Sequence, residues 1–258
     1  MTSIDLNCDM GEAFGPWRMG NDAELLRLVS SANIACGFHA GDPTTMRKTA
    51  ELAIENGVAI GAHPGYPDLL GFGRRKISMS ALEVYDIILY QVSALKGICE
   101  SLGTSLNHVK PHGALYNEAA GNRDLAEAIA RAVRSIDADL VLYGLSGSEL
   151  ITAAEAAGLM PASEVFADRT YQADGSLTAR TRPDALMGDP MAAAEQACGF
   201  VENSEVFSTD GKSVKVVADT ICIHGDGPHA VEFAVAIRTE LEKRNIRIAA
   251  ISARNDGR

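Results

Sequence analysis

Short apolar runs rich in β-branched residues recur along this chain, and helical patterns separate most of them. Two strands that are joined through a helix lie parallel in a sheet, because an antiparallel pair would need only a short turn. The apolar runs lie near residues 3–8, 31–36, 58–62, 107–111, 139–143, 163–166 and 217–223, with a weaker eighth run near 246–250. This alternation predicts a parallel sheet with helices packed against it.

The helices are predicted from the residues that begin and end them. The clearest helix starts after Asp42, a capping residue, with Pro43 at its first position, and it ends at Asn56 and Gly57. Further helices are predicted over residues 79–102, 122–136, 147–157, 189–202 and 228–244.

The length of the chain, 258 residues, allows one large α/β domain. Seven or eight strand–helix units in an undivided chain favour a closed or nearly closed β/α barrel over a doubly wound open sheet, which remains the alternative. We predict a single barrel domain over residues 1–258, because no linker, low-complexity tract or fixed-period repeat divides the sequence. Asp-Gly pairs at 174–175 and 210–211 predict hairpin turns in the loops around the last strands.

Composition argues against several classes of partner. A formal charge of −11 and a pI near 5.0 disfavour binding to nucleic acid or to an anionic membrane, since both need a basic patch. The five cysteines are odd in number and lack CxxC spacing, which predicts buried, reduced thiols. The sequence shows no secretion signal and no run of eighteen apolar residues, so we expect a cytoplasmic protein.

Polar and apolar side chains alternate along residues 5–12, so Asn7 and Asp9 would point to the same side of a strand. Polar groups inside a barrel cost roughly 2–7 kcal/mol each when they are buried without partners, so we expect these residues at an open end. Asp9 and Glu12 are therefore candidate catalytic residues, and Asn7 is a candidate substrate ligand. The alternative is a hydrogen-bonded turn in which Asp9 binds loop amides.

Histidines follow the next two strands. His39 lies among small residues between a strand end and a helix start. An even number of positions separates it from Asn33, so in an alternating pattern both side chains would point to the same side. His63 opens a long loop that contains Arg74 and Arg75, whose planar guanidinium groups suit a carboxylate or a phosphate. We predict catalytic roles for both histidines and substrate binding by Asn33 and the two arginines. Surface residues and solvated loop charges are the competing interpretations.

A lysine and a histidine follow the fourth strand. Lys110 would be costly as a buried cation, so it should pair with Asp9, Glu12 or a bound anion, or else have a lowered pKa. We predict catalytic roles for Lys110 and His112. The alternative is an ion pair that only holds neighbouring strands together.

Two later segments repeat this pattern. Residues 223–229 carry His224 and Asp226 between a strand end and a helix start, and Glu164 belongs to another alternating stretch. We predict substrate binding by all three residues. The competing interpretations are a helix cap for Asp226 and a structural salt bridge from the acidic segment around Glu164 to Arg169.

A nucleotide-binding loop is not recognisable in the sequence. Residues 209–213 resemble the end of one, but Val206 stands where the first glycine is needed. The HEXXH pattern and the GxSxG elbow are absent as well. The alternation along its strand places Cys36 on the side opposite the polar residues, which favours a buried thiol over a nucleophile. The chain therefore shows no ATP site of its own.

Together, these segments resemble the LamB/YcsF lactam-utilisation family. They occur in family order at residues 5–12, 33–43, 61–75, 109–117, 164–171 and 219–228. The resemblance implies a seven-stranded β/α barrel like that of polysaccharide deacetylases and related glycoside hydrolases. It also implies ATP-dependent opening of the lactam ring of 5-oxoproline to L-glutamate, in a multi-subunit 5-oxoprolinase with partner subunits B and C. It does not imply which subunit binds ATP.

A five-membered lactam is a stable amide with a poor leaving group, so coupling to ATP would phosphorylate its oxygen. We predict that the partner subunits perform this step with ATP and Mg²⁺, while the barrel holds the activated ring. Asp9 or Glu12 would then activate water, and His39, His63 or His112 would transfer protons. Lys110 and an arginine would offset negative charge.

Two alternatives remain at this stage. The first is a metal-dependent hydrolase or deacetylase that acts on a small amide or N-acetyl substrate. Its zinc or manganese ligands would be Asp9, His39 and His63, with a metal-bound water as nucleophile. The second is a non-catalytic chain that binds the lactam or scaffolds its partners.

Overall fold

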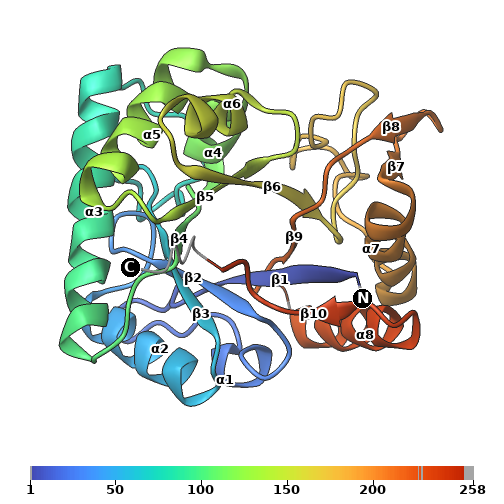
Figure 1. Cartoon of the computed structure of the whole chain (residues 1–258), viewed down its shortest axis with the longest axis horizontal. Coiled ribbons are helices and arrows are strands. Elements are labelled where there is room, and N and C mark those ends of the chain that lie inside the picture. Colours follow the sequence, from blue (N-terminus) through green and yellow to red (C-terminus); the bar gives the residue numbers. More distant parts are fainter. Residues whose placement is uncertain (1, 226, 228, 253–258) are drawn as a thin grey trace.

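Seven parallel strands form a closed barrel at the centre of the computed structural model, which describes residues 2–225, 227 and 229–252 (Figure 1). In spatial order the barrel strands are β1 (Ser3–Met10), β2 (Ser31–Ala35), β3 (Ala59–His63), β4 (His108–Val109), β5 (Val141–Leu145), β6 (Met160–Phe166) and β9 (Thr220–Ile223). Strand β9 pairs with both β6 and β1, and the pairing with β1 closes the ring. The predicted barrel is confirmed, and the open-sheet alternative is wrong.

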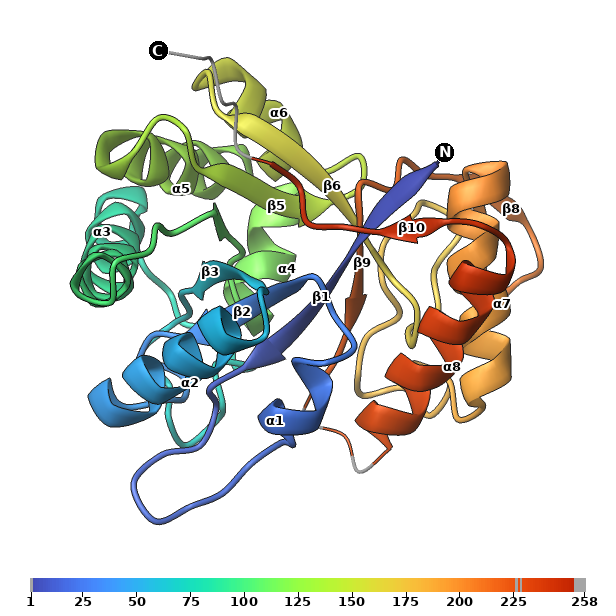
Figure 2. The same ribbon diagram turned by 60° about the horizontal axis from the view of Figure 1, so that its bottom comes forward.

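Strand β1 is the longest barrel strand and pairs with three neighbours. Residues 3–4 pair with β10 (Arg247–Ile248), residues 5–8 pair with β9, and residues 7–10 pair with β2. The eighth apolar run therefore does form a strand. It lies beside the start of β1 and outside the ring, as Figure 2 shows.

Helices surround the barrel (Figures 1 and 2). They are α1 (Asp22–Leu25), α2 (Pro43–Glu55), α3 (Ala81–Ser101), α4 (Gly113–Gly121), α5 (Arg123–Ile136), α6 (Glu149–Ala156), α7 (Pro190–Asn203) and α8 (Ala230–Lys243). The predicted start of α2 is confirmed, because the Asp42 side chain accepts hydrogen bonds from the backbone N–H groups of Thr44 (2.9 Å) and Thr45 (3.0 Å). Ser80 and Glu83 form a capping box at the start of α3.

Helices α1 and α4 were not predicted. Helix α1 is a single turn, too short to show an apolar periodicity. Helix α4 begins at Gly113, whose φ of +57° is left-handed, and the preceding residue His112 makes no side-chain cap. Helix α4 therefore lacks the usual start signal, whereas α1 has Asn21 at its N-cap but is too short for the signal to be followed by a periodic pattern.

The two faces of β1 differ in polarity. Leu6 and Cys8 are buried in the main hydrophobic core outside the barrel. On the opposite face, Asp5 accepts hydrogen bonds from the hydroxyl groups of Tyr143 (2.9 Å) and Thr220 (2.6 Å), across the barrel interior. Burial raises the pKa of Asp5 in spite of these donors. The predicted alternation along β1 is confirmed.

Both predicted hairpin turns are present. Strands β7 (Glu205–Phe207) and β8 (Ser213–Lys215) are antiparallel and are joined through the turn at residues 210–211. An antiparallel bridge between Tyr171 and Leu177 encloses the other turn.

The five cysteines are free and buried, as predicted. Burial raises the pKa of the Cys36 thiol to about 12, so this residue is not a thiolate nucleophile at neutral pH. Within the described part of the chain, no helix combines the length and the apolar character that crossing a membrane requires.

Candidate active site

A cavity of about 600 Å³ opens at the carboxyl-terminal ends of the barrel strands. Strand β1 carries Asp9 next to its last residue, His63 is the last residue of β3, and Lys110 directly follows β4. The predicted candidates that line the cavity are Asp9, Glu12, His63, Arg74, Lys110, His112 and His224. Active sites of β/α barrels are found at this end of the strands. The structure thus brings these side chains to one rim.

Lys110 is the centre of a buried ionic network. Its Nζ lies 3.0 Å from Asp9 Oδ1 and 2.8 Å from Glu164 Oε1, and only 3% of its side chain is exposed. It also lies 5.3 Å from the centre of the Phe166 ring. Burial disfavours the ammonium group, but the Asp9 carboxylate and neighbouring groups outweigh this effect and raise the pKa of Lys110 well above its usual value. Lys110 is therefore paired with Asp9, as predicted, and positively charged.

Asp9 is ionised beside this lysine. Its Oδ1 accepts a hydrogen bond from Asn33 Nδ2 (2.8 Å), and its Oδ2 lies 3.4 Å from His63 Nε2. Burial alone would raise the pKa of Asp9, but His63 and Lys110 outweigh burial and lower the pKa well below its usual value. A carboxylate with such a low pKa is a weak proton acceptor. Asp9 is therefore better suited to stabilising His63 when the ring takes up a proton than to activating water itself.

His63 and His112 face each other through ring nitrogens. His63 Nδ1 lies 2.7 Å from the carbonyl oxygen of Lys110, and His112 Nε2 lies 2.8 Å from that of Phe72. Carbonyl oxygens only accept hydrogen bonds, so these two nitrogens carry protons. The remaining nitrogens, His63 Nε2 and His112 Nδ1, are 2.9 Å apart, and in neutral rings both would carry a lone pair. Two facing lone pairs repel each other, so a shared proton or another cation would stabilise this contact.

His39 stacks on His112, with ring centres 3.7 Å apart and planes parallel to within 3°. It is 1% exposed, and neither of its ring nitrogens has a hydrogen-bond partner. Its Nε2 is 4.0 Å from Glu12 Oε1, which is too far for a hydrogen bond. Gly65 leaves space for the ring, because a Cβ there would lie 2.7 Å from His39 Nδ1. Burial and the neighbouring histidines lower the pKa of His39, so its ring is neutral.

Asn7, Asn33 and Glu164 lie beneath the cavity and do not line it. Asn7 Nδ2 donates to Glu164 Oε1 (3.0 Å), and Asn33 Nδ2 donates to both Asn7 Oδ1 (2.7 Å) and Asp9. Substrate binding by these three residues therefore stays a prediction. Asn7 and Asn33 hydrogen-bond to protein groups and position Asp9 and Lys110, whereas Glu164 Oε2 has no hydrogen-bond partner among the described residues.

The two arginines of the long loop differ in position. Arg74 lines the cavity, and its guanidinium carbon lies 4.8 Å from the centre of the Phe72 ring. Arg75 does not line the cavity, contrary to the prediction. Its Nε donates to Asp68 Oδ1 at 3.1 Å, and 64% of its side chain is exposed. Pairing with Asp68 therefore holds Arg75 outside the candidate site.

His224 lines the cavity next to an acidic partner. Its Nδ1 lies 2.8 Å from Asp168 Oδ2. Burial would raise the pKa of Asp168, but His224 outweighs it and the pKa is lowered. Asp226, the remaining predicted ligand, lies outside the described residues.

Arg169 and Arg180 also line the cavity, and sequence reasoning did not assign them to it. Arg169 is 4% exposed and donates to the carbonyl oxygens of Thr178 (2.6 Å) and Ala185 (3.2 Å), so its guanidinium group makes backbone contacts where the competing interpretation had a salt bridge. Burial and Arg180 lower the pKa of Arg169 to about 10, which leaves it positively charged at neutral pH. These arginines give one wall of the cavity a positive potential. Arg180 lies in a loop without a motif, so no local signal predicts it.

Two groups of side chains within the described residues have the composition of a metal site. The first consists of Glu12, His39, His63 and His112, whose ligand atoms lie within 4.8 Å of one another. The second consists of Asp9, Cys222 and His224. Lys110 Nζ lies 3.0 Å from both Asp9 Oδ1 and Cys222 Sγ, so an ammonium group already occupies the second group. The residues of the first group fit a metal ion better, and they include two of the three predicted ligands.

The sequence is similar to named proteins over nearly its whole length. A family model described as the LamB/YcsF family matches residues 4–256. A protein of Tolumonas auensis, named as the A subunit of 5-oxoprolinase, is 59% identical over 251 residues, which are 97% of this chain and 100% of that protein. A protein of Bacillus subtilis (strain 168) with the same name is 55% identical over 252 residues, 98% of each chain.

The structure is also similar to solved structures. The lactam utilization protein from Thermus thermophilus is 45% identical, with a TM-score of 0.92 over 97% of this chain and 100% of that chain. A putative cellobiose-phosphate cleavage protein from Enterococcus faecalis V583 is 14% identical, with a TM-score of 0.54 over 96% and 97% of the two chains. This second likeness concerns the fold alone.

Proposed function

The chain belongs to the LamB/YcsF family, and from this premise we propose that it is the A subunit of a 5-oxoprolinase. In this proposal it takes part in opening the lactam ring of 5-oxo-L-proline to L-glutamate, coupled to ATP hydrolysis. The observation that supports it most is the 59% identity to a protein of that name over 97% of this chain and the whole of that protein. The cavity is consistent with amide hydrolysis, because it combines a buried cation, carboxylates and imidazoles at one rim.

The reaction requires a bond from water oxygen to the lactam carbon, cleavage of the carbon–nitrogen bond and a proton for the departing nitrogen. Phosphorylation of the lactam oxygen by ATP would make the carbon susceptible to water and would release phosphate afterwards. The chain has no sequence pattern for a nucleotide-binding loop. We therefore assign phosphorylation, with ATP and Mg²⁺, to partner subunits B and C in the cytoplasm, where ATP is available.

The geometry suggests which side chains act on the activated ring. His63 and His112 line the cavity and offer facing ring nitrogens, so they are placed to take a proton from water and to return one to the ring nitrogen. Asp9 would stabilise His63 when the ring takes up a proton, and the Lys110 charge balances the carboxylates around it. Arg74 and Arg169 are placed to bind the substrate carboxylate or the transferred phosphoryl group.

Reconstitution tests this proposal directly. The purified chain is mixed with partner subunits B and C, 5-oxoproline, ATP and Mg²⁺, and both glutamate and ADP are measured. We expect glutamate only when all three subunits are present, and no stimulation of ATP hydrolysis by 5-oxoproline in the chain alone. A complete mixture that forms no glutamate would contradict the assigned function. ATP hydrolysis by the chain alone, at the rate of the full complex, would contradict the division between subunits.

The same assay separates the two alternatives. A metal-dependent hydrolase would release product from a small amide or an N-acetyl substrate without ATP, and a chelator would abolish that activity. A purely scaffolding chain would support full activity of the complex after substitution of Asp9, His63 or Lys110.

A further inference from the structure

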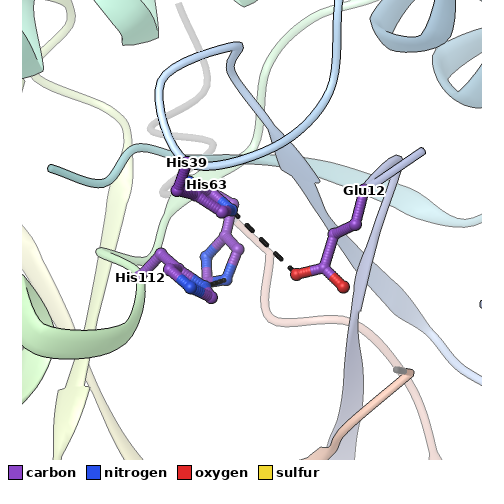
Figure 3. A group of neighbouring side chains, drawn as sticks. All are labelled: Glu12, His39, His63 and His112. Atoms are coloured by element: carbon purple, nitrogen blue, oxygen red, sulfur yellow. Dashed lines mark hydrogen bonds and ion pairs between the residues drawn. The ribbon is translucent and has the colours of Figure 1, made fainter. Parts of the chain in front are cut away.

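We propose that Glu12, His39, His63 and His112 together bind one divalent transition-metal ion, with Zn²⁺ as the best fit. Figure 3 shows the carboxylate of Glu12 and the three imidazole rings gathered at one point of the rim. All four residues are buried. This site goes beyond the proposed function, which requires no metal on this chain, and it differs from the set of ligands expected from sequence. With an ion bound, the facing nitrogens of His63 and His112 would be ligands and would not transfer protons.

The contact between His63 and His112 is the first reason. Their facing nitrogens are 2.9 Å apart, while the opposite nitrogen of each ring is held by a backbone carbonyl oxygen. Metal-ligating histidines are typically fixed in this way, with one ring nitrogen donating to a carbonyl group or a carboxylate and the other left for the metal. The carbonyl groups of Lys110 and Phe72 therefore act as outer-shell partners of the proposed site.

The isolation of His39 is the second, independent reason. A neutral imidazole has one N–H donor and one lone pair, and in this buried ring neither has a partner. A buried polar group without a partner is destabilising, and such groups in native proteins usually mark a missing ligand or a functional role. A metal ion at His39 Nε2 would satisfy the lone pair.

Two distances between ligand atoms bracket the value expected for a tetrahedral site. Metal–ligand bonds of about 2.0–2.2 Å place neighbouring ligand atoms roughly 3.3 Å apart. The measured separations are 2.9 Å between His63 and His112 and 4.0 Å between His39 Nε2 and Glu12 Oε1, so they lie on either side of that value. Because the His39 and His112 rings are parallel, one must turn before both lone pairs meet a single ion. His39 is the ring that turns, since no hydrogen bond holds it.

The ligand types decide which metal is favoured. Three imidazole nitrogens and one carboxylate suit Zn²⁺ or Co²⁺, whereas Mg²⁺ and Ca²⁺ prefer oxygen ligands. Asp9 is not a ligand in this arrangement, because it does not belong to the group whose ligand atoms all lie within 4.8 Å of one another, and Asn33 and Lys110 hold its Oδ1. A bound ion of this kind would supply a Lewis acid at the cavity rim.

Direct binding measurements test the site without reference to catalysis. The full chain is stripped of metal with a chelator and titrated with Co²⁺ and then Zn²⁺. We expect one Co²⁺ per chain, the visible absorption band of a tetrahedral Co²⁺ site, displacement of Co²⁺ by Zn²⁺, and a higher melting temperature with metal. A wild-type chain that binds no stoichiometric Co²⁺ would overturn the proposal and would leave a shared proton between His63 and His112.

Four substitutions define the ligands. Glu12→Gln, His39→Gln and His112→Gln should each weaken Co²⁺ binding by more than the roughly 10- to 100-fold that loss of an outer-shell partner costs. Asp9→Asn should weaken it less than Glu12→Gln does. Equal Co²⁺ affinity in wild type and in the folded His39 and His112 variants would contradict the assignment. Circular dichroism checks folding, and any one folded ligand variant suffices for the comparison.

The matched control is His229→Gln, because 64% of the His229 side chain is exposed and it lies outside the group. This variant should bind Co²⁺ as wild type does. Equal losses in His229→Gln and His39→Gln would show that the measured binding is non-specific and would contradict the site. Failure of every metal test would leave the 5-oxoprolinase proposal intact, because glutamate formation is measured separately.

Discussion

The Lys110 ammonium group forms a buried ion pair with the Asp9 carboxylate, with 3.0 Å between Nζ and Oδ1 and only 3% and 9% of the two side chains exposed. Both charges lie at the cavity rim, so the same pair contributes to stability and to the electrostatics of the site. Glu164 shares the lysine at 2.8 Å. Removing one member of such a group leaves an uncompensated charge away from water.

Replacing Lys110 by methionine should therefore destabilise the protein strongly. We expect the free energy of unfolding to fall by about 3–5 kcal/mol, the usual cost of breaking a buried pair. Urea denaturation at pH 7 measures this change. The control is Lys212→Met, because Lys212 is 70% exposed and pairs with Asp210 at the surface; its effect should stay below about 1 kcal/mol. Equal effects of the two substitutions would contradict the account of Lys110.

Asn33 should act through Asp9 and not through the substrate, since it does not line the cavity. Asn33→Ala removes the hydrogen bonds to Asp9 Oδ1 (2.8 Å) and to His108 Nε2 (2.8 Å). In the reconstituted complex we expect kcat to fall with little change in KM for 5-oxoproline. A rise in KM with an unchanged kcat would instead indicate direct substrate binding.

Gly61 should tolerate no side chain. A Cβ at this position would lie 2.0 Å from His108 Nε2, and His108 is fully buried. Gly61→Ala should displace the His108 ring and destabilise the protein by about 1–3 kcal/mol or more. Gly97→Ala is the control, because Gly97 lies in helix α3 with no atom within 4 Å of the added Cβ. Thermal unfolding should show a lower Tm for Gly61→Ala and an equal or higher Tm for Gly97→Ala.

Asp42 should make the free energy of unfolding depend on pH in the acidic range. Hydrogen bonds from the N–H groups of Gly15 and Thr45 lower the pKa of Asp42 from 3.8 to about 2. A lowered pKa means that the charged cap stabilises the protein above pH 3.8 and that this contribution is lost as the pH falls towards 2. Asp42→Ala should cost about 1 kcal/mol at pH 7. The difference from wild type should shrink between about pH 4 and pH 2, and a constant difference would contradict this role.

Much of this site was predictable because each strand–helix unit places its strand end at one rim. Polar alternation located Asp9, and the polar residues after successive strands located His63 and Lys110. The alternation of side chains along a strand did not distinguish residues at the open end of the barrel from residues deeper in its interior. Asn7 and Asn33 share the face of Asp9 but lie deeper in the barrel, where they hydrogen-bond to protein groups.

Other features depend on contacts that sequence spacing does not encode. Arg74 and Arg75 are adjacent and chemically identical, yet Asp68 pairs with Arg75, while Arg74 lines the cavity. Arg169 enters the cavity wall because carbonyl groups of a later loop hold its guanidinium group. The ring orientations of His63 and His112 likewise depend on backbone carbonyl groups from two different loops.

The central claim is that the rim side chains of this subunit carry out ring opening. The most direct test is the rate of glutamate formation from 5-oxoproline by the reconstituted complex containing His63→Asn, with assembly checked by co-elution of the three subunits. We predict a rate at least about 100-fold below wild type, as loss of a general acid–base residue gives. An assembled complex with His63→Asn that forms glutamate at the wild-type rate would contradict the account.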